Sequence, residues 1–283
     1  MKVLIPDTRS CSQLGLFGPF LAERKEMIPR LLKNFLGHLR SIGEAIFFLG
    51  DIMSLILRGR VRWNDVLNQM YEQGVQSIMI VMLTSLATGT VLGLQGFITL
   101  QRFGAKEFIA RLVALSLVRE LSPVFTSLIF SGKAGAGITA ELGTMNTQDQ
   151  IQATRAMGVN PIEYLVVPRF LACFLVLPAL VIISEILGIA GGYMIAISQA
   201  RLPGAFYIHE TMQAVGYVDF FSGFIKVFFF AIIIGWICCY QGFFTRGGAM
   251  GVGRFTTKAV AYSYIAVIVS NTILTKIILT FWG

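Results

Sequence analysis

Two adjacent ionisable residues, Arg119 and Glu120, lie inside an otherwise apolar stretch of the chain. Neighbouring residues of a helix point in different directions, so the two cannot neutralise one another and each requires its own partner. Arginine binds phosphate and a carboxylate binds an amine, so the pair has the chemistry to hold a zwitterionic lipid headgroup. Protein partners or interfacial water are the open alternative. Pro123, shortly after the pair, is expected to bend the helix and open space there.

A stripe of mixed character precedes this pair in the chain. Leu92, Gln95, Thr99 and Phe103 recur at intervals of three or four residues, so on a helix they share one face. Such a face suits acyl chains that run up to a headgroup, and together with the charged pair it is the predicted lipid-binding set. Ordinary helix packing is the open alternative for the stripe.

Other chemistries have less support. Glu185 interrupts an apolar stretch and is a candidate proton-relay carboxylate, but no second carboxylate, histidine or lysine accompanies it there. His38 and His209 lie far apart, which argues against a metal site. The segment Ser131–Gly137 lacks the ending of a nucleotide-binding loop, so we interpret it as a place of close helix packing. Packing is also the predicted role of the four cysteines, Cys11, Cys173, Cys238 and Cys239. We expect no catalytic residue and no metal on this chain.

A polar segment, residues 141–169, lies between two apolar stretches. Thr147 and Gln150 have the spacing of a helix capping box, and Asp149 suits the positive end of the helix dipole. A second helix start follows at Asn160, which precedes a proline at the first helical position. The pattern predicts a short rigid helix of roughly 15 Å, at about 1.5 Å per residue. Its form is that of an element that transmits movement rather than of a catalytic centre.

The composition identifies the class of protein that holds these residues. Hydrophobic residues make up 55% of the 283 residues, charged residues only 13%, and the mean hydropathy is +0.72. These values predict an all-α integral membrane protein and exclude an ordinary soluble domain. Four stretches are long and apolar enough to span a membrane, at residues 73–101, 170–200, 227–245 and 259–275. A weaker fifth candidate, residues 112–142, carries the charged pair and Lys133.

The distribution of basic residues decides the number of spans. Lys and Arg concentrate on the cytoplasmic side. With five spans and the N-terminus inside, residues 1–72, 133–169 and 246–258 hold ten, three and three of the 23 basic residues, and the opposite side holds seven. With four spans the division falls to 13 against 10. Five spans therefore fit better, and the net charge of +8 reflects orientation and anionic lipid rather than nucleic acid.

The chain before the first span divides into two predicted parts. Residues 1–25 are expected to form a cytoplasmic tail, and residues 26–63 an amphipathic helix in the membrane interface, ahead of a transmembrane domain at residues 64–283. Apolar residues from Met27 onward recur at helical spacing, with basic residues on other faces. A helix packed against the rest of the protein is the open alternative.

Several ordered motifs resemble one known family, the MlaE/YrbE permeases. They are Val91-Leu-Gly-Leu-Gln-Gly96, Leu112-Val-Ala-Leu-Ser-Leu-Val-Arg-Glu-Leu-Ser-Pro123, Gly132-Lys-Ala-Gly135, Thr139-Ala-Glu-Leu-Gly143 and Val166-Val-Pro-Arg-Phe170. The match covers about residues 64–283. The resemblance implies an interfacial helix, five transmembrane helices and a cytoplasmic coupling helix between spans 2 and 3. It places the chain in the bacterial inner membrane, with the N-terminus cytoplasmic and the C-terminus periplasmic.

The resemblance also implies function and partners. It describes a homodimeric ABC-transporter permease that moves phospholipids between the inner membrane and a periplasmic MCE-domain protein similar to MlaD. A separate cytoplasmic ATPase, similar to MlaF, would bind the ATP and Mg²⁺, so no cofactor is expected on this chain. A small cytoplasmic STAS-domain regulator also occurs in such systems. A proton-coupled secondary transporter is the alternative function; a lipid-modifying enzyme and a scaffold for the periplasmic partner are weaker ones.

The resemblance assigns ATPase coupling to the polar segment. The predicted coupling residues are Glu141, Thr147, Asp149, Gln150, Arg155 and Arg169. Where relatives commonly have Thr-Glu-Gln, this chain has Gln148-Asp149-Gln150, which keeps the negative charge on a side chain shorter by one methylene.

Overall fold

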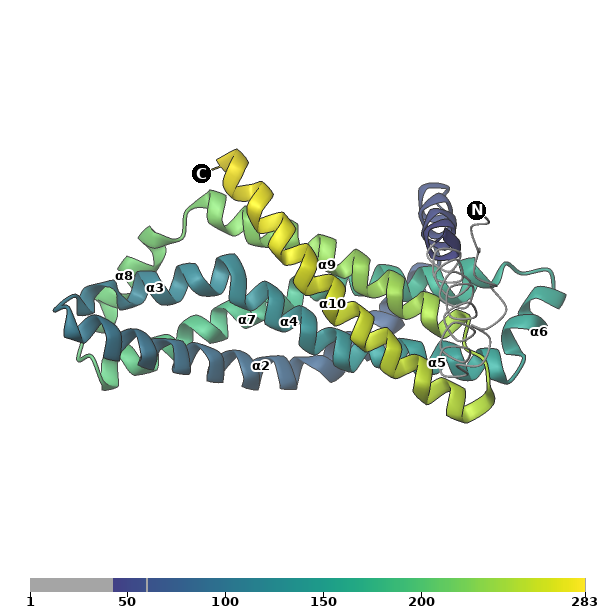
Figure 1. The fold of residues 1–283 in the computed structure, drawn as a ribbon, viewed down its shortest axis with the longest axis horizontal. Coiled ribbons are helices and arrows are strands. Elements are labelled where there is room, and N and C mark those ends of the chain that lie inside the picture. Colours follow the sequence, from purple (N-terminus) through teal and green to yellow (C-terminus); the bar gives the residue numbers. More distant parts are fainter. Residues whose placement is uncertain (1–42, 60, 283) are drawn as a thin grey trace, which may run out of the picture. The chain divides into compact units, whose positions relative to one another are not determined.

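The computed structural model describes residues 43–59 and 61–282, and this part of the chain consists of helices and short connections. Contacts divide the chain into two units, residues 1–50 and 51–283. The main helices of the second unit are α2 (Trp63–Arg102), α3 (Ile109–Ser116), α4 (Ser122–Phe130), α5 (Ala136–Thr147), α6 (Gln150–Ala156), α7 (Val167–Ser198), α8 (Gly204–Ala214), α9 (Tyr217–Phe243) and α10 (Gly248–Trp282), as Figure 1 shows. One 3-10 turn, η2 (Lys106–Phe108), and three π-helical turns, η3 (Leu117–Leu121), η4 (Ser131–Gly135) and η5 (Ile162–Val166), complete them.

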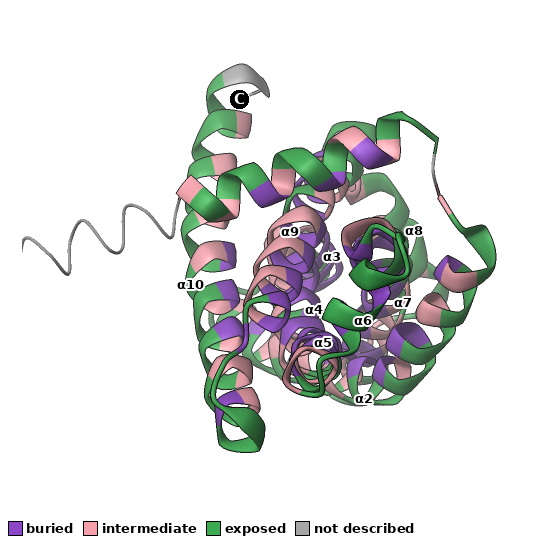
Figure 2. Cartoon of the chain, turned by 90° about the vertical axis from the view of Figure 1, so that its right-hand side faces the viewer, coloured by how far each residue is buried: buried purple, intermediate pink, exposed green. Residues whose placement is uncertain are grey.

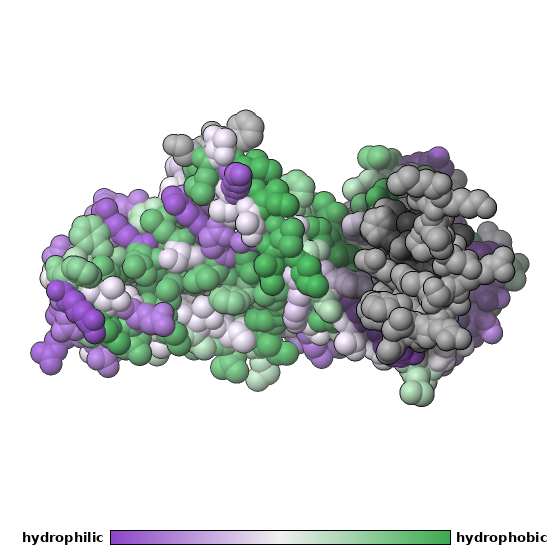
Figure 3. Space-filling view, in the orientation of Figure 1, coloured by the Kyte–Doolittle hydropathy of each residue, from purple (hydrophilic) through white to green (hydrophobic). Residues whose placement is uncertain are grey.

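Five helical segments of the described part are long and apolar enough to cross a membrane, at Trp63–Arg102, Lys106–Thr147, Ile162–Ser198, Tyr217–Phe243 and Gly248–Thr280. The predicted all-α membrane fold is therefore confirmed, including the span that hydropathy alone left in doubt. In Figure 3, hydrophobic side chains cover the middle of α9 and α10, and hydrophilic ones gather at the end of α3. The spans are longer than the charge-free stretches, and Glu120 of span 2 forms an ion pair with Lys226 of span 4.

Small residues bring α2 and α7 into close contact. A Cβ atom on Gly89 would overlap the main chain of Gly188, and one on Gly93 would lie 3.2 Å from the Cα of Gly192. Glycines four residues apart on both helices thus face each other, as expected of membrane helices that pack through small residues. Ser85 adds a hydrogen bond from its hydroxyl to that of Ser184, at 2.8 Å.

The remaining spans pack around this pair. The end-on view of Figure 2 shows buried residues gathered between the helices, with α10 along the side of the bundle. Only 11% of the apolar window of α10 is buried, against 56% for the span that contains α7. Most of α10 is therefore free to face lipid or another chain.

Helix α8 closes the end of the bundle that lies opposite α6. Its Tyr207 is buried and donates a hydrogen bond to the carbonyl oxygen of Ile189, at 3.3 Å. Burial raises the pKa of Tyr207 to about 12, so the phenol stays neutral at physiological pH. Arg111 of α3 forms an ion pair with Glu210, with a Nε to Oε2 distance of 2.6 Å. These contacts fix α8 against α3 and α7.

The predicted N-terminal parts are only partly described. The tail, residues 1–25, and the start of the predicted interfacial helix lie outside the described residues, as do Cys11 and His38. A helix is present over residues 43–57. Within it Ile52 is fully buried, whereas Phe47 and Leu57 are 80% and 83% exposed. Apolar side chains thus occupy both its buried and its exposed sides.

Candidate functional site

The charged pair of span 2 lies in a π-helical turn, η3. Ser122 donates its N–H to the carbonyl of Leu117, five residues earlier, instead of the four of an α-helix. Pro123 has no N–H, so it cannot donate to the carbonyl of Arg119 as an α-helix requires. Lys226 of α9 donates to that carbonyl instead, with Nζ 3.1 Å from the oxygen. A side chain from another span thus satisfies a polar group that proline leaves free.

Arg119 pairs with Asp219 at the start of α9. Its Nε donates to Oδ1 of Asp219 at 2.7 Å, and its Nη2 lies 2.5 Å from the same oxygen. The Arg119 side chain is nevertheless 49% exposed. A guanidinium has five N–H donors, so the ion pair leaves most of them available.

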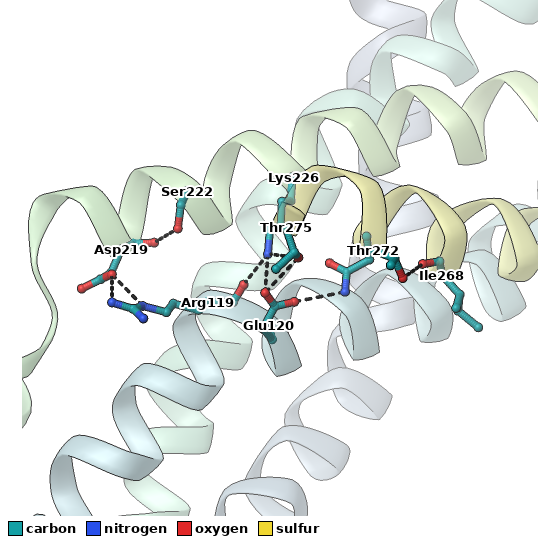
Figure 4. A network of polar contacts seen from close by, with 9 residues as sticks. Arg119, Glu120, Asp219, Ser222, Lys226, Ile268, Thr272 and Thr275 are labelled. Atoms are coloured by element: carbon teal, nitrogen blue, oxygen red, sulfur yellow. Dashed lines mark hydrogen bonds and ion pairs between the residues drawn. The ribbon is translucent and has the colours of Figure 1, made fainter. Parts of the chain in front are cut away.

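Glu120 is the centre of a separate cluster that joins spans 2, 4 and 5 (Figure 4). Its Oε1 lies 2.6 Å from Nζ of Lys226 and 3.0 Å from the hydroxyl of Thr275. Its Oε2 accepts from the amide of Asn271, also at 3.0 Å. The prediction that each member of the pair needs its own partner is confirmed, and both partners are protein groups, the alternative left open above. Binding of a headgroup stays a prediction.

Lys226 belongs to this charged cluster, and the sequence patterns did not single it out. It is 2% exposed, and its three donors go to Glu120, to Thr275 at 2.8 Å and to the carbonyl of Arg119. Asp219 and Lys226 are seven residues, two helical turns, apart on α9, so one face presents both signs of charge to η3. Gly223 lies between them, and a Cβ there would come within 2.5 Å of the Val118 carbonyl. This spacing of aspartate, glycine and lysine was the signal available in the sequence.

The predicted lipid-facing stripe divides in the structure. Leu92 is partly buried against the core cluster of α3 and η3, whereas Gln95, Thr99 and Phe103 are exposed. Phe103 follows the last residue of α2 and is 78% exposed. Among the described residues, no hydrogen bond joins the stripe to the charged cluster. The exposed members remain available to acyl chains, and Leu92 has the packing role that was the open alternative.

The polar segment does form a short helix between spans 2 and 3, but the predicted capping box is wrong. Thr147 is the last residue of α5, and its hydroxyl donates to the Thr144 carbonyl at 3.0 Å. Asp149 caps α6 through its backbone, in the left-handed conformation with φ 59°, and no side chain makes a capping bond. The amide of Gln150 donates to Gln148 instead. The continuation of α5 through Thr147 overrides the local capping signal.

The second helix start is confirmed. The side chain of Asn160 accepts a hydrogen bond from the N–H of Ile162 at 3.0 Å, and Pro161 is the first helical residue. Gly158, with φ +78°, follows the end of α6. The connection from α6 to span 3 is therefore short and defined at both ends.

Two of the predicted coupling residues form an ion pair. Nη2 of Arg169 lies 3.0 Å from Oε2 of Glu141, and its Nη1 donates to the Leu165 carbonyl at 2.7 Å. Arg169 is buried and links span 3 to span 2 beside α6. The other four, Thr147, Asp149, Gln150 and Arg155, lie in or next to α6 and are exposed or half-buried.

Two open hollows flank α6. One, of about 440 Å³, lies between α6 and the acidic start of α2 and is lined by residues that include Asp65, Glu72 and Gln150. The other, of about 520 Å³, is lined by Arg155 and Phe244 together with Arg246 of the α9–α10 connection. Sequence analysis did not predict that α2 and this connection would contribute to the surface around α6.

Glu185 and the described cysteines contact neither the Glu120 cluster nor α6. Glu185 is 6% exposed in α7, and no hydrogen bond or ion pair reaches it from the described residues. Cys173, Cys238 and Cys239 are buried free thiols, in agreement with a packing role. Residues 43–59 and 61–282 contain no group of three or more histidine, cysteine or acidic residues arranged to hold a metal.

Comparison with known proteins identifies the family. The sequence profile described as Permease MlaE matches residues 66–277. The chain belongs to the MlaE permease family. A probable ABC transporter permease of Rickettsia conorii is 37% identical over 238 residues, which are 84% of this chain and 92% of the relative. The intermembrane phospholipid transport system permease MlaE of Haemophilus influenzae is 35% identical over 251 residues, 88% of this chain and 96% of that protein.

A relative from outside these bacteria also matches. A probable ABC transporter permease of Synechocystis is 37% identical over 227 residues, 80% of this chain and 86% of the relative. The charged η3 turn, the Glu120 cluster and α6 all lie within the part that matches the MlaE profile. The arrangement described here is therefore that of an MlaE permease, a transport subunit with several membrane spans.

Proposed function

We propose that this MlaE permease moves phospholipids between the bacterial inner membrane and a periplasmic MCE-domain partner, as the membrane subunit of an ABC transporter. The observation that carries the proposal is the match to the Haemophilus permease, which is named for intermembrane phospholipid transport and is covered over 96% of its length. ATP and Mg²⁺ bind to a separate cytoplasmic ATPase. Two copies of the chain form the transport cavity, with the N-terminus cytoplasmic and the C-terminus periplasmic.

The charged cluster supports a role in headgroup binding. The ion pair with Asp219 leaves Arg119 half exposed, with unused N–H groups that can bind phosphate. Glu120 is 36% exposed and remains accessible to an amine after its bonds to Lys226, Thr275 and Asn271. The exposed residues of the stripe, Gln95, Thr99 and Phe103, then contact the acyl chains. The ion pairs with Asp219 and Lys226 hold the charges of Arg119 and Glu120 within the span, and both side chains remain partly exposed to a ligand.

Helix α6 supports coupling to an ATPase. It is short, its connections are defined by Asp149 and Gly158, and the Glu141–Arg169 ion pair links the two spans that it joins. A movement of α6 therefore reaches spans 2 and 3 together. The hollows on either side provide concave surfaces for a partner subunit.

The test is ATP-driven transfer of fluorescent phospholipid by the complete complex reconstituted in vesicles. Wild type should transfer phospholipid only with ATP. Asp149→Lys, on the exposed turn before α6, should retain the assembled complex and its ATP hydrolysis but lose most of the transfer. Gln213→Lys, exposed on α8 at the opposite end of the bundle, serves as the matched control. Normal transfer by Asp149→Lys would contradict the coupling role, and absence of transfer by wild type would contradict the proposed function.

A proton-coupled secondary transporter is the second candidate function, favoured by the buried Glu185, which lacks a described partner. In that case a proton gradient without ATP should drive transfer, and Glu185→Gln should abolish it. Under the proposal above, Glu185→Gln leaves ATP-driven transfer intact.

A further inference from the structure

A small cavity lies near the middle of spans 1, 2 and 3, where α2, α4 and α7 pack together (Figure 1). It gives about 10 Å³ of free space to the centre of a water molecule, which is room for one water and no more. None of the side chains that line it is charged. Six of the ten carry a hydroxyl: Thr84, Ser85, Thr88, Ser122, Thr126 and Ser184. The size and the lining both exclude a lipid headgroup.

Two of these hydroxyls have no partner in the described part of the chain. Ser122 and Thr126 are 3% and 1% exposed, and their buried side-chain oxygens make no hydrogen bond to another described residue. The two residues are four positions apart, so they share the face of α4 that lines the cavity. A hydroxyl buried in a membrane span without a partner is unfavourable, because no bulk water satisfies it there. The pair therefore points to a ligand with hydrogen-bonding groups.

Other hydroxyls of the spans find an acceptor on their own helix. Those of Ser77, Ser127 and Thr139 donate to the carbonyl four residues earlier, at 2.7, 2.7 and 2.9 Å. For Ser122 that carbonyl belongs to Val118 in the π-helical turn η3, and a Cβ on Gly223 of α9 would come within 2.5 Å of its oxygen. The usual local acceptor of Ser122 thus lies in an irregular and crowded turn, whereas the cavity offers its hydroxyl open space.

Helices α2 and α7 supply acceptors to the same cavity. The hydroxyl of Ser85 on α2 donates to that of Ser184 on α7 at 2.8 Å, and both residues line the cavity. A hydroxyl oxygen has two lone pairs, so this pair can accept further hydrogen bonds. One water molecule can accept from Ser122 and Thr126 and donate to the Ser85–Ser184 pair. About three such bonds are usual for a buried water.

We propose that this cavity binds one ordered water molecule, which joins Ser122 and Thr126 of span 2 to the Ser85–Ser184 pair of spans 1 and 3. The water is a structural ligand. It satisfies the hydroxyls beside the π-helical turn and ties the irregular part of span 2 to the seam between α2 and α7. The inference does not depend on the proposed function, because the site requires neither a lipid nor a partner subunit.

Radiolytic labelling of the full-length permease in lipid nanodiscs tests for the water. A brief X-ray pulse converts bound water into hydroxyl radicals, which oxidise the side chains in contact with it, and mass spectrometry locates the oxidised residues. Leu117 lines the cavity and Leu180 does not, and both are 2% exposed, so their burial is matched. Leu117 should be oxidised several-fold faster than Leu180 in wild type. The double variant Ser122→Ala, Thr126→Val should lower the oxidation of Leu117 to the level of Leu180.

Ser127→Ala is the matched control for the labelling. It removes a buried hydroxyl of the same helix whose hydrogen bond goes to the Pro123 carbonyl, and Ser127 does not line the cavity. This variant should leave the oxidation of Leu117 unchanged. Equal oxidation of Leu117 and Leu180 in wild type, or undiminished oxidation of Leu117 in the double variant, would overturn the inference.

The thermal midpoint of the purified permease is a second readout, with opposite signs for a hydrated and a dry cavity. With a bound water, Thr126→Val removes one of its partners at nearly constant side-chain volume, so the midpoint should fall by about 2–4 °C. In a dry cavity the same change replaces an unpaired hydroxyl by a methyl group, so the midpoint should rise or stay the same. An equal or higher midpoint would therefore contradict the bound water, and Ser127→Ala should stay close to wild type.

Discussion

At the scale of single residues, the membrane-embedded charges of this permease are held by partners far away in the sequence. Arg119 pairs with Asp219, 100 residues later, and Glu120 with Lys226, 106 residues later. A buried ion pair is weak evidence for stability in itself, but removal of one partner strands the other charge. The same four residues therefore set both the electrostatics of span 2 and its attachment to α9.

Removal of Lys226 should destabilise the protein. Lys226→Met leaves Glu120 with only Asn271 and Thr275, and leaves the Arg119 carbonyl without its donor. We expect the free energy of unfolding to fall by about 2–4 kcal/mol. This loss is somewhat smaller than that for a fully buried ion pair, because the Glu120 side chain is 36% exposed and solvent screens its charge. Unfolding in mixed detergent micelles measures it.

The control is the double variant Lys226→Met, Glu120→Gln. Because the neutral amide no longer needs a cation, the double variant should lose less stability than the sum of the two single variants. Additive losses would show that Lys226 acts on something other than Glu120.

Arg119 bears on lipid binding rather than on this internal cluster. Arg119→Ala should lower the phospholipid copurified with the complex several-fold, because the half-exposed guanidinium is the phosphate donor. Quantification of bound lipid by mass spectrometry checks it. Asp219→Asn, which weakens the ion pair but keeps the arginine, serves as the matched variant and should retain lipid; equal lipid in Arg119→Ala and wild type would contradict the assignment.

At the scale of elements, the seam between α2 and α7 depends on glycine. The facing glycines allow the two backbones to touch, and any Cβ on Gly89 would overlap the main chain of Gly188. Backbone cannot move aside as a flexible side chain can, so substitution here forces the helices apart. The contrast with glycines in open positions makes this interface testable.

Gly89→Ala should cost about 3 kcal/mol of unfolding free energy, at the upper end for overpacking, and lower the thermal midpoint of the purified protein. Gly137→Ala is the control, because a Cβ on Gly137 of α5 would meet no atom within 4 Å. That control should be neutral or slightly stabilising, by up to about 1 kcal/mol, since alanine is the better helix former. Equal midpoints for the two variants would refute close packing at this seam.

At the scale of the whole molecule, the uneven distribution of basic residues predicts the orientation in the membrane. Helix α6 and the α9–α10 connection lie at one end of the spans, and α8 lies at the other (Figure 1). Sixteen of the 23 basic residues fall in the segments assigned to the cytoplasm, so the charge bias predicts that α6 is inside and α8 outside.

Thiol labelling tests this orientation. The buried thiols should not react, so a Cys11→Ser background can carry a single new cysteine at Gln152 of α6 or at Gln213 of α8, both exposed. In intact spheroplasts a membrane-impermeant maleimide should label Gln213→Cys at once and Gln152→Cys only after lysis. The reverse pattern would invert the topology and remove the basis for coupling through α6.

The sequence by itself determined the number of spans, the short helix between spans 2 and 3, and the need of Arg119 and Glu120 for separate partners. Hydropathy, charge bias and helical spacing are properties of neighbouring residues, so they can be read from a linear chain. Only the tertiary structure decided that the partners are Asp219 and Lys226, that a lysine replaces the hydrogen bond lost to Pro123, and that Thr147 extends α5 instead of capping α6. Those outcomes depend on how packed helices are rotated and how closely they approach, which local periodicity does not specify.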